Sequence, residues 1–320
     1  MPRDRRYLVT GGAGFIGSNL VEALLVRGDR VVVLDDFSTG RRENLEKALG
    51  ARTAGTPDPL IVQGDLREAA TVRRAMRGVT HVLHQAALPS VLRSIEDPVS
   101  SHEVNAGGTL NLLVAARDAG VVRFVYASSS SVYGDSEELP KIETMAPAPL
   151  SPYAVSKLAG EHYGRIFHGL YGLETIALRY FNIFGPRQDP TSQYAAVIPN
   201  FIKAATSGAS PTVFGDGLQS RDFTYIDNAV EANLKACEAP AAAAGRAYNV
   251  ACGERTSLLD LLRALERVLG RPIRPVHGPP RPGDVRHSMA SIDEARRSLG
   301  YAPRIGLEEG LRRTVAWFTA

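Results

Sequence analysis

Apolar residues along the chain alternate between short continuous runs and the spacing of one helix face. Val31–Leu34 is an uninterrupted apolar run of strand length, which is typical of a strand buried on both faces. The residues before it that recur at helical spacing are Leu20, Val21, Leu24 and Leu25. Strands and helices alternate in this way to about residue 180. The sequence therefore predicts a parallel sheet covered by helices on both faces.

Prolines and glycines interrupt this alternation beyond residue 180. Pro186, Pro199 and Pro211 mark loops, and apolar periodicity predicts helices at Ser257–Leu269 and Ile292–Leu299. We expect these helices to build a second, smaller lobe over residues 181–320.

A glycine-rich turn follows the first predicted strand, Arg6–Thr10. The turn, Gly11–Gly17, leads directly into a helix, and the second strand ends in Asp35–Asp36. In a dinucleotide-binding unit the glycines let the backbone approach the pyrophosphate, the helix N-terminus faces the phosphates, and the acid accepts a hydrogen bond from the adenosine ribose. An acid here disfavours a 2′-phosphate and so favours NAD over NADP, although Arg41–Arg42 lie close enough in sequence to weaken that preference.

Tyr153 and Lys157 lie four residues apart, on one face of the segment if it is helical. A free tyrosine has a pKa of about 10 and is a poor base at neutral pH. A nearby cation favours the phenolate. Bringing that pKa down to about 7 requires roughly 4 kcal/mol, which a lysine and an oxidised nicotinamide together can supply. The pair is therefore a candidate for proton transfer beside a nicotinamide.

These motifs, read with the serine run Ser128–Ser131, resemble the extended short-chain dehydrogenase/reductase superfamily and, within it, the UDP-hexose 4-epimerases. The likeness runs nearly end to end. Further segments that carry it are Gly64–Leu66, His84–Ala87, Tyr180–Asn182, Arg221–Asp222 and Arg281–Asp284. The resemblance implies an α/β fold, a Rossmann-type doubly wound parallel sheet with a smaller C-terminal α/β substrate lobe. It implies an NAD-binding domain over residues 1–180, rejoined by residues 222–250, and a UDP-sugar-binding lobe over residues 181–320.

The resemblance also implies roles for single residues. Tyr153 would be the base at O4 of the sugar, Lys157 its electrostatic partner, and Ser129 a hydroxyl on the proton path. The implied NAD-binding residues are Gly11, Gly14, Phe15, Ile16, Gly17, Asp35, Asp36, Asp65, Leu66, Gln85, Ala86, Ala87, Asn105, Tyr153, Lys157 and Tyr180. The implied UDP-sugar-binding residues are Ser90, Ser129, Asn182, Val197, Phe214, Arg221, Arg281, Asp284 and Ser288.

Related enzymes on this scaffold differ in the residues before Val132–Gly134. Nucleotide-sugar 4,6-dehydratases carry an Asp-Glu pair there, whereas this chain has Ser130–Ser131. Dehydration then lacks its acid and base, and UDP-glucuronate decarboxylases, which keep the second acid, are disfavoured for the same reason. A non-catalytic NAD sensor would have lost Tyr153 or Lys157. A 4-epimerase is favoured.

The choice of sugar depends on loop resemblance. The segments His84–Ile95, Arg187–Pro190 and Tyr194–Pro199 are most similar to the branch that converts UDP-N-acetylglucosamine to UDP-N-acetylgalactosamine. Pro89 departs from that branch, which commonly has glycine there. Ser288 falls where epimerases restricted to UDP-glucose carry a bulky tyrosine, so it leaves room for an N-acetyl group. UDP-glucose and UDP-glucuronate stay open as substrates.

Composition bounds the remaining possibilities. The chain has 320 residues, 44% of them hydrophobic, and a net charge of +3, which is too small to imply a nucleic-acid partner. It has no apolar run of membrane-spanning length and no signal-peptide pattern, so we expect a cytoplasmic protein without a membrane partner. Two cysteines without metal spacing predict no metal site. Helices at Val104–Ala119 and Tyr153–Tyr171 resemble those of a four-helix interface, which implies a homodimer.

Overall fold

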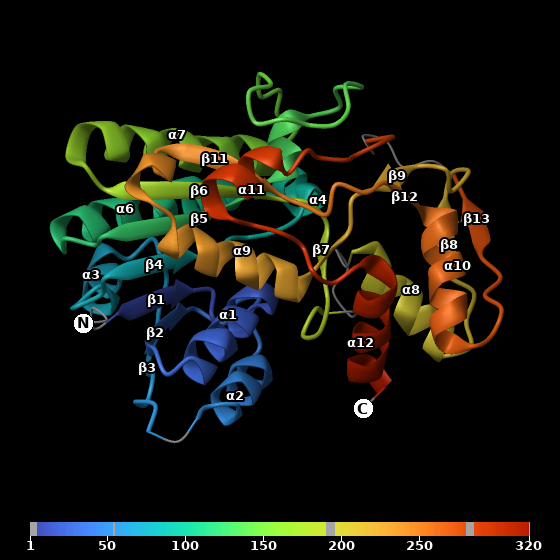
Figure 1. The fold of residues 1–320 in the computed structure, drawn as a ribbon, viewed down its shortest axis with the longest axis horizontal. Helices are drawn as coiled ribbons and strands as arrows, with labels where there is room; N and C mark the ends of the chain where they lie inside the picture. Colours follow the sequence, from blue (N-terminus) through green and yellow to red (C-terminus); the bar gives the residue numbers. More distant parts are fainter. Residues whose placement is uncertain (1–4, 54, 190–195, 280–284, 320) are drawn as a thin grey trace.

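A seven-stranded parallel sheet forms the centre of the larger lobe (Figure 1). The computed structural model describes residues 5–53, 55–189, 196–279 and 285–319. The strands run in the order β11-β6-β5-β4-β1-β2-β3. Their bounds are Arg6–Thr10 (β1), Arg30–Asp35 (β2), Leu60–Gln63 (β3), His81–His84 (β4), Arg123–Ser129 (β5), Glu174–Tyr180 (β6) and Arg246–Val250 (β11). The chain order reverses at β1 and β4, and the Rossmann-type α/β fold is confirmed.

Helices cover both faces of this sheet, as the apolar strands require. One apolar cluster joins the sheet to α1, α2, α9 and α11, and a second joins it to α3, α6 and α7. The helices of the first face are Phe15–Val26 (α1), Arg42–Gly50 (α2), Ile226–Glu238 (α9) and Asp293–Leu299 (α11). Those of the second face are Ala69–Ala75 (α3), Gly108–Asp118 (α6) and Pro152–Tyr171 (α7). Burial of strand residues on both faces explains the continuous apolar runs.

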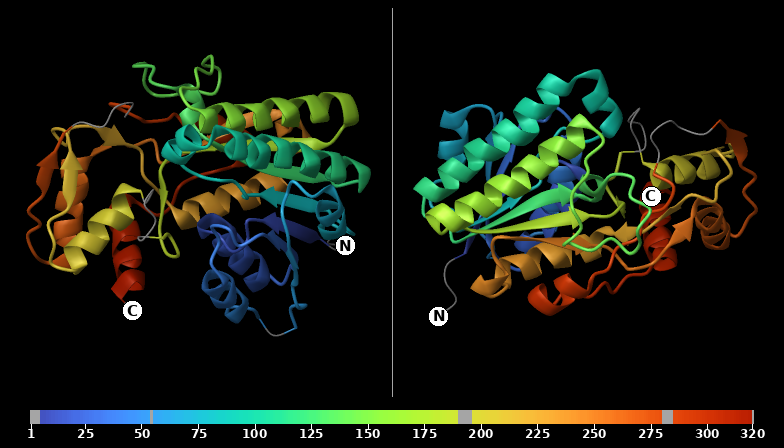
Figure 2. Two further views of the ribbon diagram at one scale, coloured as in Figure 1. Left: turned by 180° about the vertical axis from the view of Figure 1, so that it is seen from behind. Right: turned by 90° about the horizontal axis from the view of Figure 1, so that it is seen from above.

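The longest described helix, α7, has clear local signals at both ends. Ser151 caps its N-terminus by accepting a hydrogen bond from the backbone N–H of Ala154, and Pro152 occupies the first helical position. The helix ends at Gly172, whose φ of 71° lies in the left-handed region that favours glycine. Figure 2 shows α6 and α7 side by side on the outer face of the sheet.

Between β4 and α6 the chain forms three short helical turns. These are α4 (Val91–Glu96), α5 (Pro98–His102) and a π-helical turn over Glu103–Gly107. The predicted helix Val104–Ala119 therefore begins as a π-helical turn and continues as α6. A 3₁₀ turn over Ser130–Tyr133 follows β5, and another over Ala241–Ala243 precedes β11.

In its described residues, the smaller lobe is built from short strand pairs and three helices. The pairs are β7 (Ile183–Phe184) with β10 (Thr224–Tyr225), β9 (Ser220–Arg221) with β12 (Thr256–Ser257), and β8 (Thr212–Phe214) with β13 (Val276–Gly278). The helices are α8 (Val197–Thr206), α10 (Leu258–Leu269) and α12 (Leu307–Thr319). They share one apolar cluster. None of the helices in the described part of the chain has the length and apolar character needed to cross a membrane.

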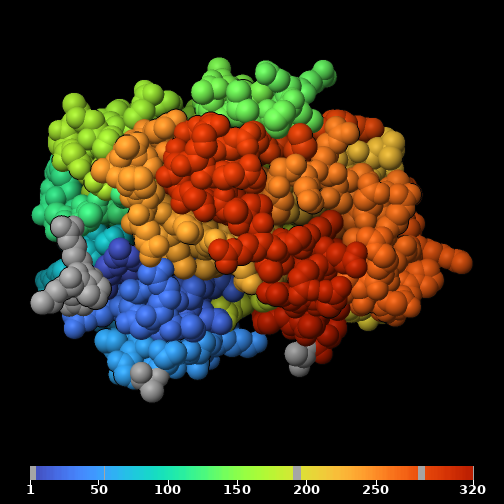
Figure 3. Space-filling model, in the orientation of Figure 1, coloured from blue at the N-terminus to red at the C-terminus, as the bar shows by residue number. Residues whose placement is uncertain are grey.

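The C-terminal half of the chain returns to the large lobe twice. Residues 226–250 supply α9 and the edge strand β11, which pairs in parallel with β6. The predicted helix at Ile292–Leu299, expected in the smaller lobe, lies instead on the large lobe as α11. Its apolar positions Ala295 and Leu299 belong to the apolar cluster of the central sheet. In the space-filling view, the red C-terminal part of the chain extends from the large lobe to the smaller one (Figure 3).

Candidate functional site

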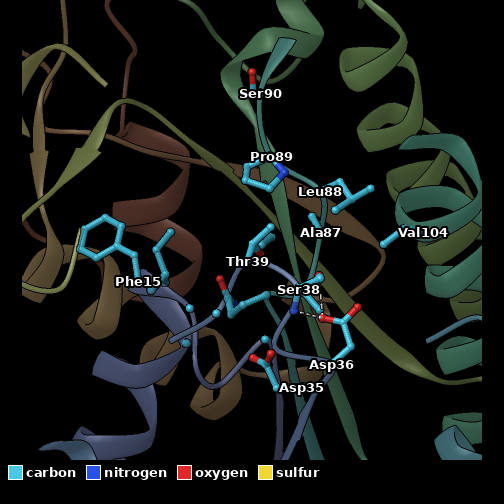
Figure 4. A pocket seen from close by; sticks show the side chains of 18 of the residues that line it. Phe15, Asp35, Asp36, Ser38, Thr39, Ala87, Leu88, Pro89, Ser90 and Val104 are labelled. Carbon is cyan, nitrogen blue, oxygen red and sulfur yellow. Dashed lines mark hydrogen bonds between the residues drawn. The ribbon is translucent and has the colours of Figure 1, made fainter. Parts of the chain in front are cut away.

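A cavity of about 440 Å³ lies at the carboxyl ends of the central strands, where doubly wound sheets bind their ligands. The predicted NAD-binding residues that line it are Gly11, Gly14, Phe15, Ile16, Gly17, Asp35, Asp36, Asp65, Leu66, Gln85, Ala86, Ala87, Tyr153, Lys157 and Tyr180. Figure 4 shows Asp35 and Asp36 at one end of this cavity and Pro89 and Ser90 at the other. The sequence motifs thus converge on one elongated cavity.

The glycine turn is too tight for side chains. Gly11 has a φ of 67°, and a Cβ there would lie 2.8 Å from the backbone of Ala86. A Cβ on Gly17 would lie 2.0 Å from the carbonyl oxygen of Gly11. Helix α1 begins at Phe15, directly after the turn, so its N-terminus faces the cavity. This cradle of bare backbone suits a dinucleotide pyrophosphate.

The two acids at the end of β2 have different surroundings. Asp35 is buried and accepts hydrogen bonds from the backbone N–H groups of Ala13 and Phe37, both at 2.8 Å. Burial raises the pKa of its carboxyl, whereas these two bonds lower it. Asp36 is exposed and accepts from the backbone N–H and hydroxyl of Ser38. Asp35 thereby ties the glycine turn to β2, and both carboxyls remain at the cavity wall.

The arginines that weakened the preference for NAD are both engaged. Arg41 forms an ion pair with Asp189 at 2.7 Å. Arg42 donates to the side chain of Gln63 at 2.9 Å, and its guanidinium lies 4.0 Å from the centre of the Phe37 ring. These contacts occupy the cations that a 2′-phosphate would otherwise attract, in accord with NAD as the cofactor.

The proposed catalytic side chains meet where β5 ends beside α7. Lys157 is buried and its ammonium donates to the carbonyl oxygen of Ala127 at 2.8 Å, 5.8 Å from the centre of the Tyr153 ring. Burial lowers the pKa of Lys157 to about 7. Burial raises the pKa of Tyr153, and a hydrogen bond with Ser129 lowers it. Without a further positive charge, Tyr153 therefore keeps its proton.

Three consecutive residues of β5 contact three side chains that follow one another at four-residue intervals along α7. Ala127 accepts from Lys157, Ser129 interacts with Tyr153, and the hydroxyl of Ser128 donates to Glu161 at 2.5 Å. Helical geometry places residues at this spacing on one face. The end of the strand therefore fixes the position of the Tyr153 and Lys157 side chains.

Glu161, which the sequence analysis missed, contacts the site through Ser128, a residue of the cavity wall. It forms a bidentate ion pair with Arg179 of β6, at 2.9 and 2.7 Å, and both side chains are more than nine-tenths buried. Arg179 also lies over the ring of Tyr133. The sequence did contain a signal for Glu161, because this residue follows Lys157 by four positions and so lies on the same helix face. Its ion-pair partner Arg179, however, belongs to another element.

Asn105 lies behind the wall of the cavity and is not among the described residues that line it. Its side-chain amide accepts from the backbone N–H of Leu88 at 2.7 Å and donates to the carbonyl oxygen of the same residue at 3.1 Å. It also donates to the hydroxyl of Ser156. Asn105 thus connects the loop after β4 to the first turns of α7.

A second cavity, of about 260 Å³, lies in the smaller lobe. The predicted substrate residues that line it are Asn182, Val197, Phe214 and Arg221. Ser90 lines the first cavity instead, whereas Ser129 and Ser288 line neither of the two among the described residues. The backbone N–H of Ser288 donates to the carbonyl of Ser220 in β9, one residue before Arg221. Arg281 and Asp284 lie outside the described residues.

Ala196 lines both cavities and so marks where they approach one another. Asn182 has a φ of 38°, a strained backbone conformation for a residue with a side chain, and its amide donates to the carbonyl of Asp222 at 3.1 Å. Gln219 also lines the second cavity, where its side-chain oxygen is buried without a partner among the described residues. A ligand that donates a hydrogen bond would satisfy this oxygen.

Comparison with known proteins gives a consistent pattern. The model of the NAD dependent epimerase/dehydratase family matches residues 7–251. The chain is 41% identical over 314 residues to the UDP-glucose 4-epimerase of Mycolicibacterium smegmatis, with 98% of each chain covered. Among solved structures, the UDP-N-acetylglucosamine 4-epimerase from Methanobrevibacter ruminantium M1 in complex with UDP-N-acetylmuramic acid matches with a TM-score of 0.92 and 38% identity, covering 99% of this chain and 98% of that one.

A further solved relative carries the cofactor. The UDP-glucuronic acid 4-epimerase from Bacillus cereus, in complex with UDP-glucuronic acid and NAD, matches with a TM-score of 0.89 and 31% identity, covering 98% of this chain and 99% of that one. These relatives agree in being 4-epimerases of UDP-sugars and differ in the sugar.

Proposed function

The chain belongs to the NAD-dependent epimerase/dehydratase family, and from this premise we propose that it converts UDP-N-acetylglucosamine to UDP-N-acetylgalactosamine and back. The broader activity is that of an NAD-dependent UDP-sugar 4-epimerase, an isomerase. UDP-glucose and UDP-galactose are proposed as a further substrate pair. The observation that carries the proposal is the presence of Tyr153 and Lys157 together at the wall of a dinucleotide cavity, with Ser129 hydrogen-bonded to Tyr153.

Epimerisation at C4 removes a hydride and a proton and returns the hydride to the opposite face of the sugar. Bound oxidised NAD supplies the hydride acceptor and a positive charge that favours the Tyr153 phenolate. Tyr153 then takes the proton from O4, and its bond with Ser129 gives that proton a second hydroxyl to share. Lys157, held by Ala127, keeps a donor beside the phenol.

The second cavity suits the UDP moiety. Arg221 supplies a guanidinium for the diphosphate, and Phe214 supplies an aromatic surface for the base. Because this anchor lies in the smaller lobe, the hexose is free to turn over between the two hydride transfers. Arg281 and Asp284, predicted from resemblance alone, complete the proposed UDP-binding set.

The residues after β5 support an epimerase over a dehydratase. Ser130 and Ser131 occupy the 3₁₀ turn, and the hydroxyl of Ser131 donates to Ser129 at 2.9 Å. Neither position offers the carboxylic acid needed to eliminate water across C5 and C6. A binding-only role is disfavoured because Tyr153 and Lys157 are both present at the cavity wall.

The preference for the N-acetylated sugar is supported by loop resemblance and by the small side chain of Ser288. Relatives named for UDP-glucose, UDP-N-acetylglucosamine and UDP-glucuronate all match the chain. UDP-glucuronate 4-epimerisation is the alternative proposal.

One assay tests both the reaction and the sugar. Purified protein is incubated with NAD and, in turn, UDP-N-acetylglucosamine, UDP-glucose and UDP-glucuronate, and the products are separated by chromatography. We expect the C4 epimer in each productive reaction, with the highest kcat/KM for UDP-N-acetylglucosamine. A higher value for UDP-glucuronate would overturn the proposed substrate, and stoichiometric 4-keto-6-deoxy sugar would overturn the reaction.

A homodimer through α6 and α7 is part of the proposal. Helix α7 exposes three large apolar side chains, Val155 (50% exposed), Ile166 (46%) and Leu170 (71%). Exposed apolar groups of this kind favour association. Light scattering coupled to gel filtration is expected to give twice the mass of one chain. A monomeric mass would contradict this part.

A further inference from the structure

The segment Gly185–Asp189, which we call the strap, joins the cofactor cavity from the other lobe. It follows β7, and three of its residues, Arg187, Gln188 and Asp189, line a cavity that is otherwise mostly built by the large lobe. In Figure 1 the yellow-green chain after β7 runs down beside α1. The strap therefore lies beside α1, the helix into which the dinucleotide-binding turn leads.

The middle of the strap is anchored on α1 and α2. The guanidinium of Arg187 donates to the carbonyl oxygen of Ser18 at 3.1 Å and pairs with Glu22, and its side chain is 9% exposed. The backbone carbonyl of Arg187 accepts from the Asn44 amide, and that of Pro186 accepts from Asn19. Arg187 has a φ of 71°, a strained conformation that persists because these contacts hold it.

The outer end of the strap forms an ion pair with the large lobe. Asp189 pairs with Arg41 at 2.7 Å, with 35% and 47% of the two side chains exposed. The backbone N–H of Arg41 donates to the carbonyl of Ala13 in the glycine turn at 3.0 Å. Ion pairs this exposed contribute about 1 kcal/mol or less, so this pair is a weaker hold than the contacts of the buried Arg187 guanidinium.

Two buried polar atoms of the strap, Nε of Arg187 and Oε1 of Gln188, have no hydrogen-bond partner among the described residues. Both residues line the cavity. One atom is a donor and the other an acceptor, which matches the phosphate oxygens and ribose hydroxyls of a dinucleotide.

We propose that the strap retains NAD in its cavity throughout the catalytic cycle, with the Arg41–Asp189 pair as its latch. This inference rests on the proposed function. An epimerase must return to C4 the hydride that it removed, so its cofactor has to stay bound until the sugar is restored. A strap that crosses from the sugar lobe to the glycine turn provides that retention.

The test measures the release of NAD without any sugar. Wild-type protein, Asp189→Asn, Arg41→Gln and the exchange variant Arg41→Glu/Asp189→Arg are loaded with NAD and diluted. The NAD still bound is extracted at intervals and quantified. Each single variant is expected to release NAD about fivefold faster than wild type, the upper range for an exposed pair, and the exchange variant is expected to release it within about twofold of wild type.

The matched control is Glu308→Gln, which removes the partner of Arg267 in an exposed pair on the smaller lobe. It is expected to release NAD at the wild-type rate. Thermal unfolding of the NAD-free proteins distinguishes loss of the ion pair from general destabilisation of the fold. If only the latch is affected, the variants and wild type should have equal unfolding midpoints. If both single variants release NAD at the wild-type rate, the proposed role of the strap is wrong. It is also wrong if the NAD-free variants unfold at a lower temperature than wild type and this loss of stability explains the faster release.

The same measurements separate this inference from the proposed function. Retention of NAD with the expected variant pattern but no epimerised product overturns the proposed reaction and supports the strap. Epimerised product with unchanged release in both single variants overturns the strap alone. A wild-type protein that binds no NAD overturns both.

Discussion

The cofactor cavity and the cavity of the smaller lobe are built on different principles. The first is shaped largely by backbone: a glycine turn, the start of α1 and the ends of parallel strands. The second is lined by side chains from short strands and helix starts, among them Phe214 and Arg221. Backbone geometry of this kind is specified by a few contiguous residues, whereas the second cavity depends on distant segments packing together.

The difference between the two cavities parallels what related enzymes share and where they differ. Relatives that act on different UDP-sugars retain the same fold and the same 4-epimerase reaction. We propose that the chemistry takes place at the first cavity and that the choice of sugar depends on how the second cavity presents the hexose to it. Substitutions in the two regions should therefore have different kinetic signatures.

The largest effect is expected for Tyr153→Phe. The change removes the group that takes the O4 proton but leaves the second cavity intact, so kcat should fall by about 10²- to 10⁴-fold. UDP affinity should stay within a few-fold of wild type. Steady-state kinetics and UDP titration check both parts, and retention of more than about a tenth of the activity contradicts the role of Tyr153.

The next effect concerns the support of the first cavity. Glu161→Gln leaves the buried guanidinium of Arg179 without its counter-charge, which should lower the free energy of unfolding by about 3–5 kcal/mol. Urea unfolding of the NAD-free protein measures it. Glu308→Gln, which breaks an exposed pair, is the control and should cost about 1 kcal/mol or less. If both variants lost the same small amount of unfolding free energy, Glu161 would not be a support of the site.

Glu161 also illustrates how far sequence reasoning extends. The glycine turn, Asp35 and the Tyr153–Lys157 pair were found because each motif is local and has one geometric consequence. The NAD-dependent epimerase family and the Rossmann-type fold followed from these motifs and are confirmed. The Glu161–Arg179 pair joins α7 to β6, and only the folded structure brings those residues together.

Residues beyond 180 were harder to place for the same reason. The segment Ile292–Leu299 was expected in the smaller lobe, yet its apolar face packs on the central sheet. Periodicity predicts that a helix has an apolar face but not which core that face joins. Asn105, which precedes residue 180, was expected to bind NAD. It is not among the described residues that line the cavity, and its amide is bonded to the backbone of Leu88.

A pH dependence is expected from Lys157 of the first cavity. Burial lowers its pKa to about 7 in the folded protein, whereas an unfolded chain titrates at about 10.4. Between these values the unfolded chain binds a proton that the folded protein does not, so stability rises with pH by up to about 1.4 kcal/mol per pH unit. Below pH 7 both states are protonated and the contribution is constant.

The comparison that isolates this group is Lys157→Met, which keeps most of the length of the side chain and removes the ammonium. The unfolding free energy of NAD-free wild type minus that of the variant should rise between pH 7.5 and 9.5. Parallel pH profiles for the two proteins would mean that Lys157 is not titrating in this range.

The smallest effect, and the one that tests the second region, is expected for Ser288→Tyr. If Ser288 admits the N-acetyl group, a tyrosine there should clash with that group and leave a C2 hydroxyl unaffected. Activity on UDP-N-acetylglucosamine should then fall by at least about tenfold, or 1.4 kcal/mol in the transition state, with UDP-glucose turnover preserved. The measurement is kcat/KM for both sugars.

The position of Ser288 sharpens the interpretation of that experiment. Its backbone is bonded to Ser220, beside Arg221, so a bulky side chain has two ways to act. Displacement of Arg221 would weaken UDP binding and reduce activity on both sugars together.

Ser288→Ala is the control, since it removes the hydroxyl without adding volume and should leave the ratio of the two kcat/KM values unchanged. Equal losses on both sugars, or no loss on either, would show that Ser288 does not select the sugar. The preference would then depend on the loop that carries Pro89 and Ser90 at the wall of the first cavity, and the division of labour between the two cavities would not hold.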